Sequence, residues 1–433
     1  MFECICLALV FALMIYLIRR RVDVSYALVT GAVVVGLCFG IEWSRVPRGV
    51  GPALGGIVVN LGKAAIDPAN LQLLGLVLLI QLLGHTLKHG GGLQQLIGTL
   101  KSLLRDRRAA MAAGPALIGL LPTPGGALFS APMVGELANG LSVPGEDRTL
   151  INYWFRHVWE WTWPLYPGLL FASAILRAPL DRIILANAPL TLGAILIGAV
   201  FCFRRVHLPP DDHKSHGPAT WRDLLAGVWP IVLLIVLTAA PALGRAAGMP
   251  VPLSTGAALL IALAVVNPLL LWSRRTPWRE VWGLVRQTLS VRLIVLVYGV
   301  VAFRQMLDAY QAGGNLARAF AEWGVPEPLL LFALPLSVGL LTGYMPAAVA
   351  ICFPLVASLI VDAAGVHYGR LALAYAGGLF GVLLSPVHLC LVLSTEYFKA
   401  DFGRVYRGLF RMVAALAAVA VGTWLLWEAV GPR

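Results

Sequence analysis

Long apolar runs separated by short polar stretches follow one another along the whole chain. A bilayer core about 30 Å thick needs about 20 apolar residues per helix, and most of the runs approach this length. The uninterrupted runs cover 2–18, 24–43, 69–87, 182–203, 223–243, 252–272, 288–307 and 408–430. Two further apolar stretches, 150–177 and 371–397, are broken by proline. The pattern predicts an all-α polytopic membrane protein with about ten transmembrane helices.

Helix breakers interrupt two more apolar segments, at about 109–139 and 328–361. The first contains Pro-Thr-Pro-Gly-Gly at 122–126, and the second contains Thr-Gly-Tyr-Met-Pro-Ala at 342–347. Backbone groups freed by proline and glycine cannot face lipid, so such a break must line a cavity or be buried in protein. We therefore expect two re-entrant hairpins whose tips enter the membrane from opposite faces. A simple kink is the alternative for either break taken alone.

The two hairpins belong to an internal duplication. Short matches occur in the same order in both halves of the chain: Gly119-Leu120-Leu121 with Gly339-Leu340-Leu341, Pro132 with Pro354, and Trp163-Pro164-Leu165 with Ser385-Pro386-Val387. The predicted repeats are 1–203 and 223–433, joined by a polar cytoplasmic linker at 204–222. Each repeat crosses the membrane an odd number of times, which inverts the second relative to the first. Inverted repeats with broken helices in matching positions are typical of transporters.

Composition and charge agree with a membrane protein. The chain has 433 residues, of which 59% are hydrophobic and 12% charged, against roughly 25% charged in a typical soluble domain. The formal net charge is +12, but the basic residues lie in short loops, so topology rather than nucleic acid accounts for them. Placing the basic loops in the cytoplasm puts both termini on the non-cytoplasmic side of the cell (inner) membrane. The first run has its arginines after it, unlike a cleavable signal peptide.

Three segments carry a resemblance to a known family: PTPGGALFSAP at 122–132, LTGYMPAAVAICFPL at 341–355 and GVLLSPVHLCLVLSTEYF at 381–398. They resemble domain of unknown function 401, an uncharacterised integral-membrane family grouped with the ion transporter superfamily of citrate, gluconate, dicarboxylate and sodium/proton carriers. The resemblance covers nearly the whole chain. It implies a scaffold and a mobile transport domain with elevator-type alternating access, and a homodimer as in many related carriers. The Ser-Asn-Thr signatures of divalent anion/sodium symporters are absent from both tips.

The hairpin tips and the second proline break supply the candidate substrate-binding residues. Glycine lets the backbone approach a ligand closely, and half-helix N-termini beside an unwound turn suit an anion. The candidates are Pro122, Thr123, Pro124, Gly125, Gly126, Thr342, Gly343, Tyr344, Ser385, Pro386 and His388.

Ionisable residues at membrane depth are candidates for binding the coupling ion. We select His157, Glu160 and His388. On a continuous helix, Tyr153, His157, Glu160 and Pro164 would share one face. A histidine and a carboxylate beside one cavity could bind a coupling proton, because histidine titrates near neutral pH.

Structural roles are the alternative for each of these residues. Arg156 and Glu160 could pair at the cytoplasmic interface, beside an aromatic belt of Trp154, Trp159, Trp161 and Trp163. His388 could be hydrogen-bonded to neighbouring backbone. Arg304 and Asp308, four residues apart, favour a structural ion pair.

These features predict a secondary active transporter, a symporter of a small carboxylate-like organic anion with H⁺ or Na⁺. Neither tip contains Asp or Glu, which argues against the alternative, a cation/proton antiporter. An intramembrane enzyme is a third reading, but the HExxH, GxxxxGK[ST] and GxSxG motifs are absent. The six cysteines lie in or at the ends of apolar runs without CxxC spacing. Because His157 and Glu160 alone offer too few ligands, we expect no metal and no cofactor.

Overall fold

The computed structural model describes residues 2–41, 50–88, 99, 103–104, 106–122, 125–204, 206, 208 and 220–431. Secondary structure in this part of the chain is almost entirely helical, as predicted. The exception is a short antiparallel hairpin of β1 (Val361–Asp362) and β2 (Gly365–Val366). Most of the predicted linker at 204–222 lies outside the described residues.

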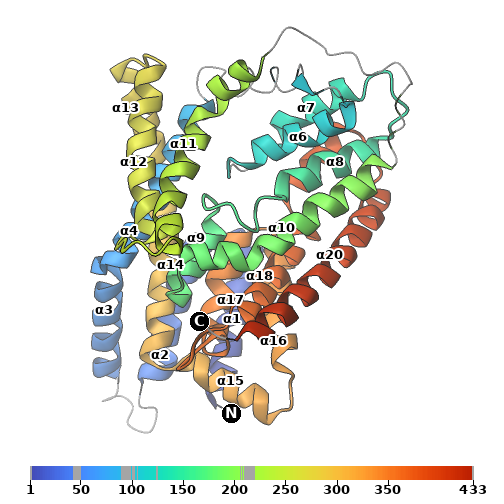
Figure 1. The fold of residues 1–433 in the computed structure, drawn as a ribbon. Coiled ribbons are helices and arrows are strands. Elements are labelled where there is room, and N and C mark those ends of the chain that lie inside the picture. The colour runs from blue at the N-terminus through green and yellow to red at the C-terminus, as the bar shows by residue number, and fades with distance from the viewer. Residues whose placement is uncertain are drawn as a thin grey trace.

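The helices pack in two groups that stand side by side in Figure 1. The first group contains α1 (Phe2–Arg19), α2 (Val24–Gly40), α3 (Val50–Ile66), α4 (Pro68–Lys88), α11 (Trp221–Ala246), α12 (Thr255–Ser273), α13 (Trp278–Thr288) and α14 (Val291–Ala309). The second contains α6 (Arg107–Gly119), α7 (Ala127–Leu137), α8 (Gly145–His157), α9 (Pro167–Leu176), α10 (Leu180–Phe203), α16 (Glu327–Thr342), α17 (Met345–Ile360), α18 (Tyr368–Leu383), α19 (Leu389–Tyr397) and α20 (Phe402–Val430). Helix α15 (Ala312–Glu322) packs against α17 and α1.

Helices from the two halves of the chain pair in parallel within the first group. Helix α2 packs along α14, and Asp23, the N-cap of α2, forms an ion pair with Arg292 in the first turn of α14. Helix α12 packs along α4, and Arg274 at the end of α12 donates to the Thr86 carbonyl near the end of α4 (2.6 Å). Both halves of the chain therefore contribute helices to the first group.

The second group contains helix–break–helix units where the sequence predicts hairpins. Helices α6 and α7 pack against each other, as do α16 and α17. Together they span Arg107–Leu137 and Glu327–Ile360, close to the predicted 109–139 and 328–361. Two further breaks separate α8 from α9 and α18 from α19, within the segments predicted to be broken.

Glycines allow α16 and α18 to approach each other closely. A Cβ added at Gly377 would collide with the Phe332 carbonyl oxygen, and one at Gly381 with the Leu336 carbonyl oxygen. Small residues at such spacing let helix backbones pack closely inside membranes. This contact fixes α18, and with it the break that follows, against the second hairpin.

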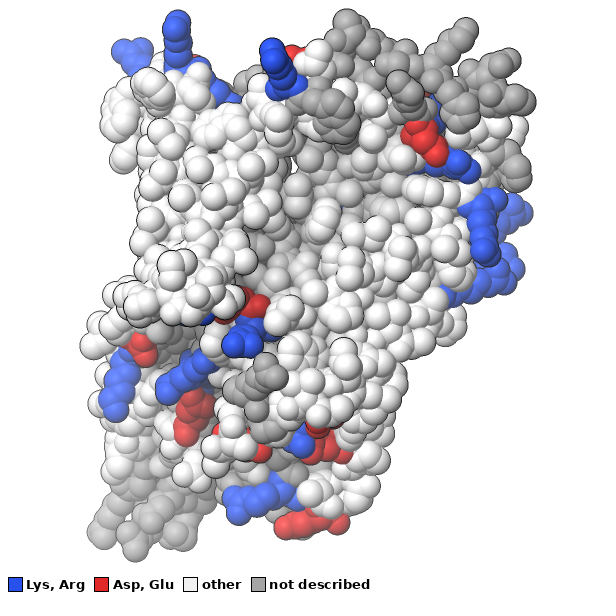
Figure 2. All heavy atoms as spheres, in the orientation of Figure 1, with Lys and Arg blue, Asp and Glu red and all other residues white. Residues whose placement is uncertain are grey.

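Several described helices are suited to crossing a bilayer. Helices α4, α10, α11, α12 and α20 are long and apolar enough individually, and α13 with α14 would qualify as one span with a 40° bend. Seven apolar helices of 10–17 residues, including α7, α9, α16 and α17, are shorter. In Figure 2 a broad uncharged face over α11 and α12 separates basic side chains at the top from mixed charges lower down. The chain is a multi-pass membrane protein, and the count of about ten crossings stays a prediction.

Three described helices, α3, α13 and α15, lie outside the predicted apolar runs. Helix α3 contains four glycines within its span, at 51, 55, 56 and 62, and α13 is amphipathic, with the sequence WREVWGLVRQT. A search for continuous apolar runs misses both, because glycine lowers helix propensity and an amphipathic helix has no unbroken apolar run.

The close approach of α16 and α18 generates the first prediction. Gly381→Ala should lower stability by about 1–3 kcal/mol, because the added methyl group overpacks a backbone contact. The control is Gly422→Ala in α20, where a Cβ meets nothing within 4 Å, and which should leave stability unchanged or slightly raised. Thermal unfolding of the detergent-purified variants measures both, and equal midpoints for the two variants would contradict the predicted packing.

Candidate functional site

Both hairpin tips lie against one short segment of the second half, residues 385–393. At the first tip, a Cβ on Gly125 would lie 3.6 Å from Leu393 Cδ1. At the second tip, a Cβ on Gly343 would lie 3.0 Å from His388 Cα. Both glycines have positive φ, 67° and 62°, which other residues adopt only at a cost. The fold brings the two tips to one region, although Thr123 and Pro124 of the first tip lie outside the described residues.

The break between α8 and α9 supplies hydrogen-bond donors to the end of α6. The last carbonyl groups of a helix have no intrahelical partner, and at membrane depth the protein must provide one. The donors are aromatic: Trp159 Nε1 to the Ala116 carbonyl (2.9 Å), Trp163 Nε1 to the Leu120 carbonyl (2.8 Å) and the Tyr166 hydroxyl to the Gly119 carbonyl (2.5 Å). The break thereby holds the first tip in place.

The tryptophans of this region do not form a lipid-facing belt. Trp154, Trp161 and Trp163 are buried, and Trp154 Nε1 donates to the Ala194 carbonyl in α10 (2.7 Å). The aromatic-belt alternative is wrong for these three tryptophans, because their side chains are buried inside the protein.

The break between α18 and α19 supports the second tip in a similar way. The Ser385 hydroxyl donates to the Leu340 carbonyl (2.7 Å), and His388 Nδ1 lies 2.7 Å from the Gly343 carbonyl oxygen. Thr342 donates its hydroxyl hydrogen within its own helix, to the Val338 carbonyl (2.8 Å). Three of the candidate residues therefore shape the second tip through bonds to backbone.

The three coupling-ion candidates come together between the two breaks. His157 Nε2 lies 3.0 Å from His388 Nε2, and Glu160 Oε1 lies 3.8 Å from His157 Nε2. His157 Nδ1 lies 2.6 Å from the Tyr153 carbonyl oxygen. The fold thus joins residues that stand more than 200 positions apart in the sequence.

Helix α8 ends at His157, which corrects the predicted shared face. Residues 158–166 form turns, so Glu160 and Pro164 do not continue the helical face of Tyr153 and His157. The proline- and tryptophan-rich segment turns instead of continuing as helix, and Glu160 approaches His157 through that turn. The Tyr153 hydroxyl donates to the Leu383 carbonyl at the end of α18 (3.0 Å).

Arg156 belongs to the site, although the sequence alone suggests only an interfacial pair with Glu160. The residue is 4% exposed. A Cβ on Gly126 would collide with its guanidinium, so the arginine head lies directly against the backbone of the first tip. Its Nε donates to Cys390 Sγ (3.4 Å). An arginine within an apolar segment beside a candidate histidine was the signal in the sequence.

Cys390 is a second residue that the sequence analysis missed. Read as a small hydrophobe, it lies instead with its Sγ in a group with the ring nitrogens of His157 and His388, all within 4.8 Å of one another. Its position two residues after His388 places it in the first turn of α19. Asn152 connects the same region, donating to Ser394 Oγ in α19 (2.8 Å) and to the Ala127 carbonyl in α7 (3.2 Å).

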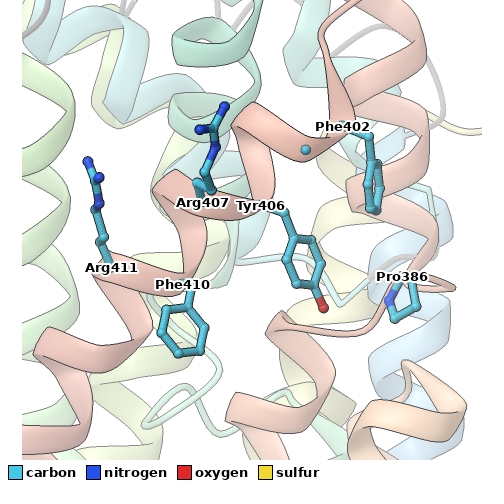
Figure 3. A pocket seen from close by; sticks show the side chains of 7 residues that line it. Pro386, Phe402, Tyr406, Arg407, Phe410 and Arg411 are labelled. Carbon is cyan, nitrogen blue, oxygen red and sulfur yellow. The ribbon is translucent and has the colours of Figure 1, made fainter.

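Two of the candidate residues are not part of this cluster. Pro386 lines a separate cavity of about 560 Å³ against the first turns of α20, and Figure 3 shows the Tyr406 hydroxyl pointing toward it. Tyr406 donates to the Leu384 carbonyl, so α20 also supports the second break. Tyr344 is 39% exposed.

Arg304 and Asp308 form the predicted pair, with Nε 3.4 Å from Oδ2. Arg304 also borders a cavity of about 1470 Å³ that lies between the two helix groups. Residues of both groups line this cavity, among them Arg177 and Asp181 from the second and Arg245 from the first.

Comparisons with known proteins place the chain in a family. No curated protein sequence matches it. Among solved structures, the YdaH transporter of Alcanivorax borkumensis is similar, with 17% sequence identity, a TM-score of 0.48 and coverage of 98% of each chain. A family model described as protein of unknown function (DUF401) matches residues 5–427. The chain therefore belongs to the DUF401 family.

Proposed function

We propose that this protein is a secondary active transporter of small carboxylate-like organic anions, driven by an H⁺ or Na⁺ gradient. The observation that carries the proposal is the buried guanidinium of Arg156 against Gly126, the N-cap residue of α7. Charged residues inside membrane proteins mark substrate and ion pathways, and the planar guanidinium matches a carboxylate with two parallel hydrogen bonds.

The surroundings of the first tip favour an anion over a cation. Gly125 lies close to Leu389 and Leu393, so the N-terminal ends of α7 and α19 meet there, and helix N-termini carry partial positive charge. Lys88 Nζ lies 5.4 Å from the ring centre of Phe129 in the first turn of α7. The tip sequence itself contains no Asp or Glu. Anions bind readily at such helix N-termini.

The proposal includes two inverted repeats, 1–203 and 223–433. Contacts between helices occur in reciprocal pairs: α2 with α14 and α12 with α4, α7 with α19 and α17 with α9, α8 with α20 and α18 with α10. The pairs are reciprocal if the chain is duplicated so that α2, α4, α7, α8, α9 and α10 correspond to α12, α14, α17, α18, α19 and α20. Each contact is then the counterpart of the other contact in its pair. The reciprocity supports the repeat that the sequence predicts.

The division into two groups supports elevator-type movement as part of the proposal. We assign the first group as the scaffold and the second, which holds both hairpins and both breaks, as the moving domain. The cavity of about 1470 Å³ between them leaves room for one group to slide past the other. Such rigid-body movement of one domain carries a bound substrate across without unfolding the site.

A cation/proton antiporter is the second candidate, because the structure adds one observation in its favour. Glu160, absent from either tip sequence, lies near His157 in the site. A carboxylate there is what a cation exchanger needs. Arg156 in the same region opposes a net negative site, so the anion carrier remains the better-supported function.

Uptake into proteoliposomes tests the proposal. Labelled small carboxylates should accumulate under an imposed inward H⁺ or Na⁺ gradient, and the gradient that drives accumulation identifies the coupling ion. A collapsed gradient should leave only equilibration. Exchange of Na⁺ for H⁺ without any dependence on an anion would contradict the anion carrier and support the antiporter.

Arg156→Lys should weaken substrate binding by about tenfold to a hundredfold, because a hydrogen bond to a charged group is worth roughly 1.5–3 kcal/mol and lysine cannot reproduce the planar fork. The control is Arg370→Lys, whose arginine pairs with Glu327 and donates to the Leu359 carbonyl away from the tips. Concentration dependence of uptake measures both variants. Equal loss in both, or none in Arg156→Lys, would remove Arg156 from the substrate site.

Gly126→Ala should reduce uptake strongly, because the added Cβ displaces the Arg156 guanidinium from the first tip. Gly62→Ala in α3 is the matched control, since a Cβ there meets nothing within 4 Å. Size-exclusion profiles should show both variants folded. If Gly126→Ala transports like the control, the contact between the tip and Arg156 has no role in transport.

A further inference from the structure

We propose that His157, His388 and Cys390, with Glu160 in the fourth position, form a binding site for a transition-metal ion of the Zn²⁺ type. Three of these residues are the coupling-ion candidates, but the inference does not depend on anion transport and rests on the geometry and hydrogen bonds of these side chains. It reverses the expectation of no metal, which followed from the two ligands that one stretch of sequence offers. The fold adds two more from 230 residues away.

The hydrogen bonds of the two imidazole rings fix which ring nitrogens are donors and which are acceptors. His157 Nδ1 lies 2.6 Å from the Tyr153 carbonyl oxygen, and His388 Nδ1 lies 2.7 Å from the Gly343 carbonyl oxygen. A carbonyl oxygen only accepts, so both Nδ1 atoms carry hydrogen. In the neutral rings both Nε2 atoms are then acceptors, yet they face each other at 3.0 Å. Two lone pairs that face each other at this distance repel, so a proton or a metal cation is needed between them.

The third potential ligand favours a metal ion over a shared proton. Cys390 Sγ lies with both Nε2 atoms in a set whose members are all within 4.8 Å of one another. In a tetrahedral zinc site, with Zn–N bonds of 2.0–2.1 Å, two ligating nitrogens are about 3.3 Å apart. The observed separation of 3.0 Å is close to this value. A proton shared by the two rings would not require a sulfur atom in the same place.

The surrounding contacts resemble those of an established metal site. Ligating histidines usually donate their other N–H to a carbonyl or carboxylate, which fixes the ring and the tautomer, and both rings do so here. Arg156 Nε donates to Cys390 Sγ (3.4 Å), so the sulfur also has a supporting hydrogen bond. Thiolate and imidazole ligands select Zn²⁺ and related ions over Mg²⁺ and Ca²⁺.

Burial and charge are consistent with a closed site. His157 is 3% exposed and Cys390 6%. Glu160 Oε1, 3.8 Å from His157 Nε2, supplies a carboxylate at nearly the spacing of a fourth ligand, and the thiolate and carboxylate together balance a divalent charge. His157 ends α8, His388 is the N-cap of α19 and Cys390 lies in the first turn of α19. An ion bound here would therefore connect the two helix breaks.

Cobalt substitution tests the site directly. Detergent-purified full-length protein, stripped with a chelator, should bind one equivalent of Co²⁺ and develop the visible bands of tetrahedral Co²⁺ and a near-ultraviolet thiolate-to-cobalt band. Zn²⁺ should displace the Co²⁺ and abolish both. Absence of saturable Co²⁺ binding by the folded protein would overturn the proposal, and a histidine pair that shares only a proton would give that result.

Matched variants separate this site from adventitious binding. Cys390→Ser should lose the thiolate band, and His157→Gln and His388→Gln should each weaken Co²⁺ binding beyond the roughly 10–100-fold that loss of a supporting contact costs. The controls are Cys352→Ser in α17 and His367→Gln, whose ring lies 2.8 Å from the Asp362 carboxylate outside the cluster. Size-exclusion profiles establish folding. An unchanged spectrum in Cys390→Ser, or equal loss in the controls, would overturn the site. Uptake is not measured, so the outcome is independent of the proposed transport.

Discussion

The carbonyl groups at the ends of interrupted helices need hydrogen-bond donors, and the rest of this structure depends on how they are supplied. A helix that stops at membrane depth leaves its last C=O groups without partners, and hydrocarbon offers no replacement. Here α6 and α16 both end at a hairpin tip, and each receives donors from the break that follows it in the same half of the chain. The hairpins and the breaks are thus mutually dependent, since neither the tip nor its supporting turn satisfies its backbone alone.

This dependence explains why so many polar side chains converge in an apolar chain. The first half uses aromatic donors, Trp159, Trp163 and Tyr166, which bring bulk as well as hydrogen bonds. The second half uses the smaller polar side chains of Ser385 and His388. The two breaks therefore use hydrogen-bond donors of different chemistry. The candidate site lies between the break with bulky aromatic donors and the break with smaller polar donors.

The sequence predicts the backbone plan better than it predicts the side-chain cluster. Proline and glycine mark the hairpins and both breaks, because these residues act locally on the helix that contains them. The end of α8 at His157 follows from the turn-rich segment after it, yet the alternation of Trp and apolar residues there resembles a helix. Arg156 and Cys390 acquire their roles only by meeting across more than 230 positions, which no local pattern encodes. The placement of Thr123 and Pro124 lies beyond the described residues, so their assignment still depends on sequence.

Arg156 connects the two proposed sites physically. Its Nε bonds to the sulfur of Cys390, while its guanidinium lies against the backbone of the first tip. Without an anion, the buried positive charge of Arg156 opposes a cation at the histidines, because charges interact strongly where water is excluded. An anion at the tip would offset that charge and favour the cation. A cation ligated by the Cys390 thiolate would in turn draw negative charge from the sulfur and leave Arg156 less neutralised, which favours the anion. Because coupling between two binding equilibria is reciprocal, the same arginine would link occupancy of the cluster to occupancy of the tip in both directions.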